Sequence, residues 1–345
     1  MYHKIILTYF IGAIVSFAVF GLELGSSDTL DKTKQDICEF SVEHETNSKP
    51  QGLNKLNEWA NNLPILKTQD DSIISHMKDL IRQQENNPLI SKDTIIDHFQ
   101  RILAFPLQTV CHVGKIIALQ KWSHVGGATD GERYLCMDNF FKDIKSGSCV
   151  IYSFGISNDY SFEEKMGSIG CVVHAYDPTI NLSPMPTKNV YFHKIGLSHF
   201  KGDMKVTVNY PKRGLSDPLP VTTLIDAINT NGDLGKEITY VKVDIESSEV
   251  KAIPQWIESG ILKHVRQIGI ELHTGRSYFN RSGQAEAAKS LFKSISQLYD
   301  LGFRHISYAP NLFVDKRQDH QNQYYTFIDI VLYKPYKLIE KQIRI

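Results

Sequence analysis

The sequence predicts an α/β fold, with a doubly wound, mainly parallel sheet covered by helices on both faces. From about residue 132, apolar β-branched runs alternate with amphipathic segments, which is typical of parallel strands joined by crossover helices. The first run breaks at Gly155, where the strand turns into the next element. The second run ends in Asp177, 22 residues after that glycine. This interval is close to the roughly 20 residues between the glycine turn and the acidic strand end of a ligand-binding βαβ unit.

Seven apolar, β-branched or aromatic runs have the pattern of strands. In chain order we expect them at 149–154, 170–176, 190–195, 239–245, 265–273, 303–308 and 324–333. A loop joins the last two, so we expect an antiparallel hairpin at one edge of the sheet.

Periodic segments between these runs predict the helices. The clearest are 160–168, 249–259 and 284–301, and Gly260 and Gly302 follow the last two as C-terminal caps. We further expect a helix at 95–125 with a break at Pro106, a helical segment at 221–229, an inserted edge strand at 205–210, and short helical stretches at 53–59 and 72–85.

The opening turn indicates a nucleoside ligand. Gly155 would let the backbone approach it, and Asp177 could accept both ribose hydroxyls. A single glycine and the lack of a Gly-x-x-x-x-Gly-Lys motif fit a ligand without a pyrophosphate, such as S-adenosylmethionine. Plainer interpretations are a tight turn at Gly155 and a cap by Asp177 on the turn at Pro178. Gly196, after the third strand, could line the adenine or lie in a plain loop.

Acidic residues lie at the carboxyl end of the fourth strand, at the edge where open α/β sheets bind substrates. Asp244 and Glu246 need partners there, because a carboxylate in an apolar strand loses its hydration. The partner could be the methionine amino group, an acceptor hydroxyl or a metal. Glu271 and His273 end the fifth strand and would lie beside them. His273 is the best candidate for a general base, since its ordinary pKa lies near neutral pH.

Alternatives remain for these side chains. His273 could be a satisfied, partly buried histidine. Asp244 with Glu271 or His273 could hold a divalent ion, but no ligand spacing demands one, so no metal site is predicted. We expect Glu249 to be an early helix residue that faces solvent. Glu163 could bind the ligand or only interact with a helix dipole.

Length and charge limit the partners. The 345 residues accommodate one large domain of about 200 residues plus extra segments. Lys+Arg and Asp+Glu both number 38, so the formal net charge is zero. No basic block offers a face to nucleic acid, which disfavours that class of substrate.

The N-terminal segment predicts a membrane anchor. Lys4 precedes 18 uncharged residues at 5–22, and acidic residues follow, which orients the start of the chain toward the cytosol. We expect a type II signal-anchor, with a cleaved signal peptide or a buried helix as alternatives. Two glycosylation sequons and five cysteines fit a protein of the secretory pathway, although Cys149 and Cys171 could simply be small core residues.

An ordered set of motifs resembles a known family. The motifs are RYLCMD at 133–138, VIYSFGI at 150–156 with SFE at 161–163, AYDP at 175–178, VKVDIE at 241–246 and IELH at 270–273. With these the chain resembles animal methyltransferase-like proteins of the "methyltransferase-like protein twenty-four" type, which are related to FkbM-type O-methyltransferases. The resemblance covers roughly residues 110–335. It departs at Ser247, where the related pattern usually has a glycine.

The resemblance implies a Rossmann-like, seven-strand methyltransferase domain at 109–337. Before it we expect a signal-anchor or signal peptide at 1–25 and a stem with a helical lead-in at 26–108, and after it a tail at 338–345. The expected cofactor is S-adenosylmethionine, with a small-molecule, glycan or protein acceptor. The alternative is a catalytically silent lumenal binding protein on the same scaffold. The expected cofactor-binding residues are Phe154, Gly155, Ile156, Asp177, Gly196 and Asp244, and the expected catalytic residues are His273, Asp244 and Glu246.

Overall fold

The computed structural model describes a large part of the chain after residue 63. The described ranges are 64–87, 89–104, 114–117, 133–138, 140–157, 159–181, 187–205, 207–208, 214–275, 279–310 and 327–334. The predicted anchor at 1–25 and the helical stretch at 53–59 lie outside them. Within these ranges no helix combines the length and the apolar character that a membrane crossing needs.

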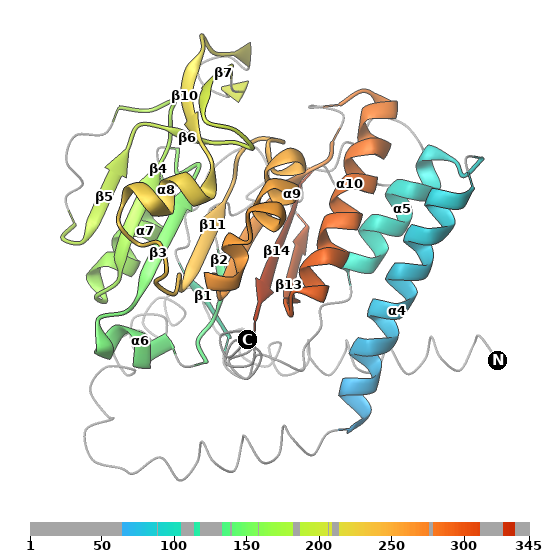
Figure 1. Ribbon diagram of the computed structural model, residues 1–345, viewed down its shortest axis with the longest axis horizontal. Coiled ribbons are helices and arrows are strands. Elements are labelled where there is room, and N and C mark those ends of the chain that lie inside the picture. Colours follow the sequence, from blue (N-terminus) through green and yellow to red (C-terminus); the bar gives the residue numbers. More distant parts are fainter. Residues whose placement is uncertain are drawn as a thin grey trace, which may run out of the picture. The chain divides into compact units, whose positions relative to one another are not determined.

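A seven-stranded sheet forms the main sheet of the described residues (Figure 1). Its strand order is β13-β14-β12-β11-β3-β4-β5, and β14 runs antiparallel to both of its neighbours while the other pairs are parallel. This confirms the predicted α/β sheet with a closing antiparallel hairpin. The bounds are β3 Val150–Phe154, β4 Val172–Tyr176, β5 Val190–His193, β11 Tyr240–Val243, β12 Gln267–His273, β13 Arg304–Pro310 and β14 Phe327–Tyr333.

Helices cover both faces of this sheet, as predicted for a doubly wound fold. Because successive side chains of a strand point to opposite faces, β3 contributes Tyr152 and Phe154 to one core and Ile151 to the other. The first core packs against α4, α5, α8, α9 and α10, and the second against α6 and α7. The bounds are α4 Pro64–Asn86, α5 Lys92–Leu103, α6 Phe140–Ser146, α7 Ser161–Ser168, α8 Leu224–Thr230, α9 Glu249–Ser259 and α10 Arg281–Asp300. A short 3-10 helix, η1 Ile261–His264, follows α9.

The lead-in helices α4 and α5 pack against α10 (Figure 1). Met77 of α4 and Phe99 of α5 are fully buried and belong to the same core as Phe292 of α10. Phe99 and Phe292 meet edge to face, with ring centroids 6.2 Å apart. The lead-in therefore shares a core with the sheet, while the predicted domain boundaries at 25, 108 and 337 stay predictions.

One sequence expectation was wrong, and another was confirmed with a later start. The helix predicted at 95–125 ends at Leu103, and Gly114–Ile117 forms β1, which pairs antiparallel with β2 (Arg133–Cys136). The helical segment predicted at 221–229 begins only at Leu224, because residues 221–222 pair with β6 and β7 as part of β10. In both places a short apolar run is compatible with a helix or a strand, and pairing with a neighbouring strand determines which of the two forms.

Within the described ranges, three small sheets accompany the central one. They are β1 with β2, the set β6-β10-β7, and β8 with β9. The last pair includes 207–208 of the predicted edge strand at 205–210. The bounds are β6 Gly196–Leu197, β7 Gly202–Met204, β8 Thr207–Val208, β9 Gly214–Leu215 and β10 Leu219–Thr222.

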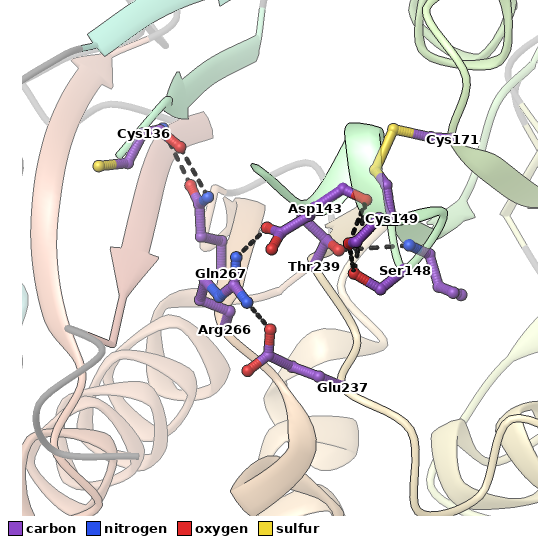
Figure 2. Close-up of polar contacts among 11 residues, drawn as sticks. Cys136, Asp143, Ser148, Cys149, Cys171, Glu237, Thr239, Arg266 and Gln267 are labelled. Atoms are coloured by element: carbon purple, nitrogen blue, oxygen red, sulfur yellow. Dashed lines mark hydrogen bonds and ion pairs between the residues drawn. A yellow bond between two sulfur atoms is a disulfide. The ribbon is translucent and has the colours of Figure 1, made fainter. Parts of the chain in front are cut away.

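A buried polar network fixes the amino end of β12 (Figure 2). Arg266 is fully buried and forms ion pairs with Asp143 of α6 and with Glu237. The neighbouring Gln267 side chain donates to the carbonyl of Cys136 at 2.8 Å and accepts from its amide at 2.9 Å. The Gln267 side chain thus makes the pair of hydrogen bonds that a neighbouring strand would make, and it links β2 to the central sheet.

Cys149 and Cys171 form a disulfide (Figure 2). Both are buried, as expected for small core residues, but the sequence interpretation missed the bond between them. The two cysteines directly precede the adjacent parallel strands β3 and β4, so the register of these strands brings them together.

Candidate functional site

The carboxyl ends of β3, β4 and β11 meet at Gly155. Its amide donates to the carbonyl of Tyr176 at 2.9 Å, and the amide of Asp244 donates to the carbonyl of Phe154 at 3.0 Å. Gly155 has a φ of +76°, and a Cβ at this position would overlap the carbonyl oxygen of Asp244. The chain's own packing therefore requires glycine here, whether or not a ligand approaches the turn.

Asp177 accepts hydrogen bonds from two turns, the one that follows β3 and the one that follows β4. It is buried, and one carboxylate oxygen accepts from the amide of Ser157 at 2.9 Å. The other oxygen accepts from the amide of Thr179 at 2.8 Å and from its hydroxyl at 2.6 Å. The predicted cap on the following turn is therefore present. Since a carboxylate offers about four acceptor positions, these three bonds leave capacity for a ligand hydroxyl, and the ribose contact stays a prediction.

Three other predicted cofactor-binding residues, Phe154, Ile156 and Gly196, have side chains that are buried in the core or absent. The buried ring of Phe154 stacks on Tyr176 with centroids 4.7 Å apart, and Ile156 is buried in the opposite core. Gly196 begins β6 beside the Asp177 turn, where a Cβ would lie 3.1 Å from both Pro178 Cγ and Val221 Cγ1. Their roles toward a cofactor stay predictions.

The three predicted catalytic residues come together at the carboxyl ends of β11 and β12. His273 Nε2 lies 3.6 Å from Asp244 Oδ1 and 3.9 Å from Glu246 Oε2. The side chain of His273 is only 3% exposed, whereas those of Asp244 and Glu246 are 25% and 27% exposed. A buried imidazole thus faces two carboxylates that solvent can reach.

A turn with two consecutive left-handed residues carries Glu246 to this position. Glu246 has a φ of +53° and Ser247 a φ of +79°. Positive φ values cost L-residues about 1–2 kcal/mol each, and such strain concentrates at functional sites. The backbone at Ser247 therefore has a conformation that usually favours glycine, although serine occupies the position.

Glu249 orients His273, contrary to the expectation that it faces solvent. It is fully buried at the first position of α9. Its Oε1 accepts from the backbone amide of His273 at 2.5 Å and lies 3.2 Å from the ring nitrogen Nδ1. The sequence feature that could have pointed to Glu249 is its position, three residues after Glu246 at the start of the helix that follows β11.

The surrounding carboxylates change the protonation of His273. Burial alone would lower its pKa, but Glu249, Glu271 and Asp244 outweigh this effect and raise the pKa well above its ordinary value of 6.5. A raised pKa favours the protonated form of the ring. This direction argues against His273 as the general base in this state, and its role stays a prediction.

A buried acidic residue lies under the opening turn. Glu163 of α7 is fully buried, accepts a hydrogen bond from the Ser153 hydroxyl, and lies 3.4 Å from the ammonium of Lys242. Its second oxygen, Oε2, has no hydrogen-bond partner among the described residues. The ion pair with Lys242 compensates part of the burial of the carboxylate.

Comparison with known proteins gives the family. A family model described as "Methyltransferase domain" matches residues 116–326, more than half of the chain. The chain belongs to this methyltransferase-domain family. The match covers β2 through β13 and therefore the carboxyl edge with Gly155, Asp177, Asp244 and His273.

Two curated proteins are similar to the chain. "Probable methyltransferase-like protein 24" of Homo sapiens is 24% identical over 203 residues, covering 56% of this chain and 53% of that protein. The Rattus norvegicus protein of the same name is 24% identical over 166 residues, covering 47% and 44%. The chain thus aligns with about half the length of these relatives. A solved structure titled "Putative hemolysin from Streptococcus thermophilus" covers 63% of this chain and 77% of its own, at 14% identity and a TM-score of 0.29.

Proposed function

We propose that this protein transfers a methyl group from S-adenosylmethionine to an oxygen acceptor. One observation carries the proposal. At the carboxyl edge of a methyltransferase-family sheet, a glycine turn and a buried aspartate lie on adjacent strands, next to a partly exposed pair of carboxylates around a buried histidine. Open α/β sheets bind their ligands at this edge.

The residues on the β3–β4 side fit a nucleoside. Asp177 keeps acceptor capacity beside the turn at Gly155, and a ribose offers hydroxyl donors to such a carboxylate. Phe154, Ile156 and Gly196 would contribute backbone surface. When bound, S-adenosylmethionine supplies a methyl group on a sulfonium, which is already a good leaving group. The protein's own part is to align the acceptor and to take up its proton.

The residues on the β11–β12 side would serve the acceptor. Because Asp244 and Glu246 are partly exposed while His273 is buried, an acceptor hydroxyl reaches the carboxylates first. Its proton would pass to Asp244 Oδ1 or Glu246 Oε2. The adjacent ring of His273, held by Glu249, would stabilise the arrangement electrostatically. A small molecule, a glycan or a protein side chain could present this hydroxyl.

The second candidate is a catalytically silent binding protein on the same scaffold. The observation that favours it is the use of both Asp177 oxygens by the chain itself.

We also propose that the protein works in the secretory pathway, as a single-pass membrane protein or in secreted form. The buried disulfide Cys149–Cys171 supports an oxidising compartment.

Titration of the full chain with S-adenosylmethionine and S-adenosylhomocysteine tests the proposed function. We expect saturable heat for the parent and at least tenfold weaker binding for Asp177→Asn, which retains one acceptor oxygen for Thr179. Asp300→Asn is the control, since this exposed residue ends α10 and, among the described residues, forms its ion pair with Lys78. If the parent binds neither compound, the silent protein is the better account. If Asp177→Asn keeps its melting temperature and binds like the parent, the ribose assignment is wrong.

A further inference from the structure

Asp244, Glu246 and His273 have the composition of a metal-binding site. Each can present one ligand atom, two carboxylate oxygens and one imidazole nitrogen, and these atoms lie within 4.8 Å of one another. They come from the ends of two neighbouring strands, β11 and β12, so the sheet fixes their relative position.

The spacing of these atoms fits a metal ion held between them. His273 Nε2 is 3.6 Å from Asp244 Oδ1 and 3.9 Å from Glu246 Oε2, beyond direct hydrogen-bond distance. Two atoms that each lie about 2.1 Å from a metal are roughly 3.0–4.2 Å apart, depending on the angle between them. Both separations fall in this interval. The carboxylates are partly exposed, so a small rotation of either can complete the set.

Glu249 supplies the support that a metal-binding histidine needs. Histidines that bind metals usually donate their second ring N–H to a carboxylate or carbonyl, which fixes the ring and its tautomer. Here Glu249 Oε1 lies 3.2 Å from Nδ1 of His273 and also accepts from the backbone amide of His273. Nδ1 is thus engaged on the helix side, and Nε2 faces the two carboxylates, where a bound metal ion would displace the Nε2 proton. Glu249 is fully buried, so this contact is shielded from competing water.

The charge of the cluster also favours a cation. Four carboxylates surround His273, namely those of Asp244, Glu246, Glu249 and Glu271. Like charges at such distances repel one another, and a bound divalent ion becomes the dominant local charge. The imidazole favours a transition metal over Mg²⁺ or Ca²⁺, and Mn²⁺ is the transition metal that also suits carboxylate ligands.

We propose that Asp244, Glu246 and His273 bind a divalent transition-metal ion, with Glu249 as the positioning residue. Since the protein supplies three ligand atoms, positions remain open on the exposed side of the carboxylates. The second part rests on the proposed function: the ion selects acceptors whose oxygen atoms can bind it, so hydroxyl acceptors are favoured over amines.

Mn²⁺ binding to the full chain, freed of metal by a chelator, tests the site. The free-Mn²⁺ signal in electron paramagnetic resonance should show one saturable site per chain, with Mg²⁺ at least tenfold weaker. Glu246→Gln, at a partly exposed position that tolerates the change, should weaken Mn²⁺ at least 100-fold. Glu249→Gln should weaken it 10- to 100-fold although all three ligands remain. The control is Glu258→Gln, an exposed residue on the same helix α9, which should bind Mn²⁺ like the parent.

The outcomes separate this proposal from the proposed function. No saturable Mn²⁺ site in the parent, or parent-like affinity in Glu246→Gln, overturns the metal site. Tighter binding of Mg²⁺ than of Mn²⁺ overturns its assignment to a transition metal. The titration needs no S-adenosylmethionine, so a protein that binds Mn²⁺ but not S-adenosylhomocysteine keeps the metal site and loses the methyl-transfer function.

Discussion

Removal of the disulfide Cys149–Cys171 gives the most quantitative test of the fold. The bond links the residues that precede β3 and β4, the two strands that carry Gly155 and the Asp177 turn. We consider Cys149→Ala, Cys171→Ala and the double variant. Both side chains are buried, and alanine introduces no polar group at either position.

The expected loss follows from the length of the closed loop. The sequence separation is 22, and the chain-entropy model then gives about 11 cal/mol/K, or about 3 kcal/mol at 25 °C. The compact unit extends from Leu63 to Ile345, which corresponds to an unfolding entropy of roughly 0.6 kcal/mol/K. The melting temperature should therefore fall by about 5–6 °C.

The three variants distinguish a cross-link from two small core residues. A cross-link is lost completely with either cysteine, so each single variant should lose about as much as the double variant. Independent core residues would instead give losses that add. Urea unfolding measures the loss of unfolding free energy, and calorimetry measures the fall in melting temperature. Additive losses, or a double variant within about 1 kcal/mol of the parent, would refute the reasoning.

Three further predictions concern single positions. Ser247→Gly should raise the unfolding free energy by about 0.5–1 kcal/mol, because glycine relieves the positive φ at a small entropic cost. Gly155→Ala should prevent stable folding, since its Cβ would overlap the carbonyl oxygen of Asp244. The matched control is Gly232→Ala, where φ is a similar +72° but the space around the Cβ is open. Its unfolding free energy, measured with urea, should fall by only about 1 kcal/mol. Burial and the neighbouring His174 lower the pKa of His193 to about 4; the unfolded state therefore binds the proton first, and stability should fall as the pH drops from 6.5 toward 4. His193→Gln should make this fall shallower, and equal pH profiles would contradict the assignment.

The sheet could be predicted because its strands carry their own signals. The helix 249–259 was predicted with its observed bounds, and Gly260 ends it with a φ of +69°. The run at 114–117 was misassigned because four residues specify neither helix nor strand. Its structure depends on β2, which lies well beyond it in the sequence.

The candidate site could be predicted only in part, for a related reason. Asp244 and Glu246 follow β11, and His273 ends β12. Both strands carry a clear signal, so the convergence of these residues follows from strand order. The role of Glu249 depends on how the first turn of α9 packs against the end of β12, and no local pattern encodes that contact. The disulfide likewise depends on the register between β3 and β4.

The position of β14 has a consequence for synthesis on the ribosome. β14 (Phe327–Tyr333) is the last strand of the sheet in the sequence, yet it lies between β12 and β13 and pairs with β12 along all seven residues. Until it emerges, β12 presents an open edge that can pair with another nascent chain. A stop codon anywhere before Phe327 would therefore remove an interior strand, and the shortened product should aggregate rather than fold as a trimmed protein.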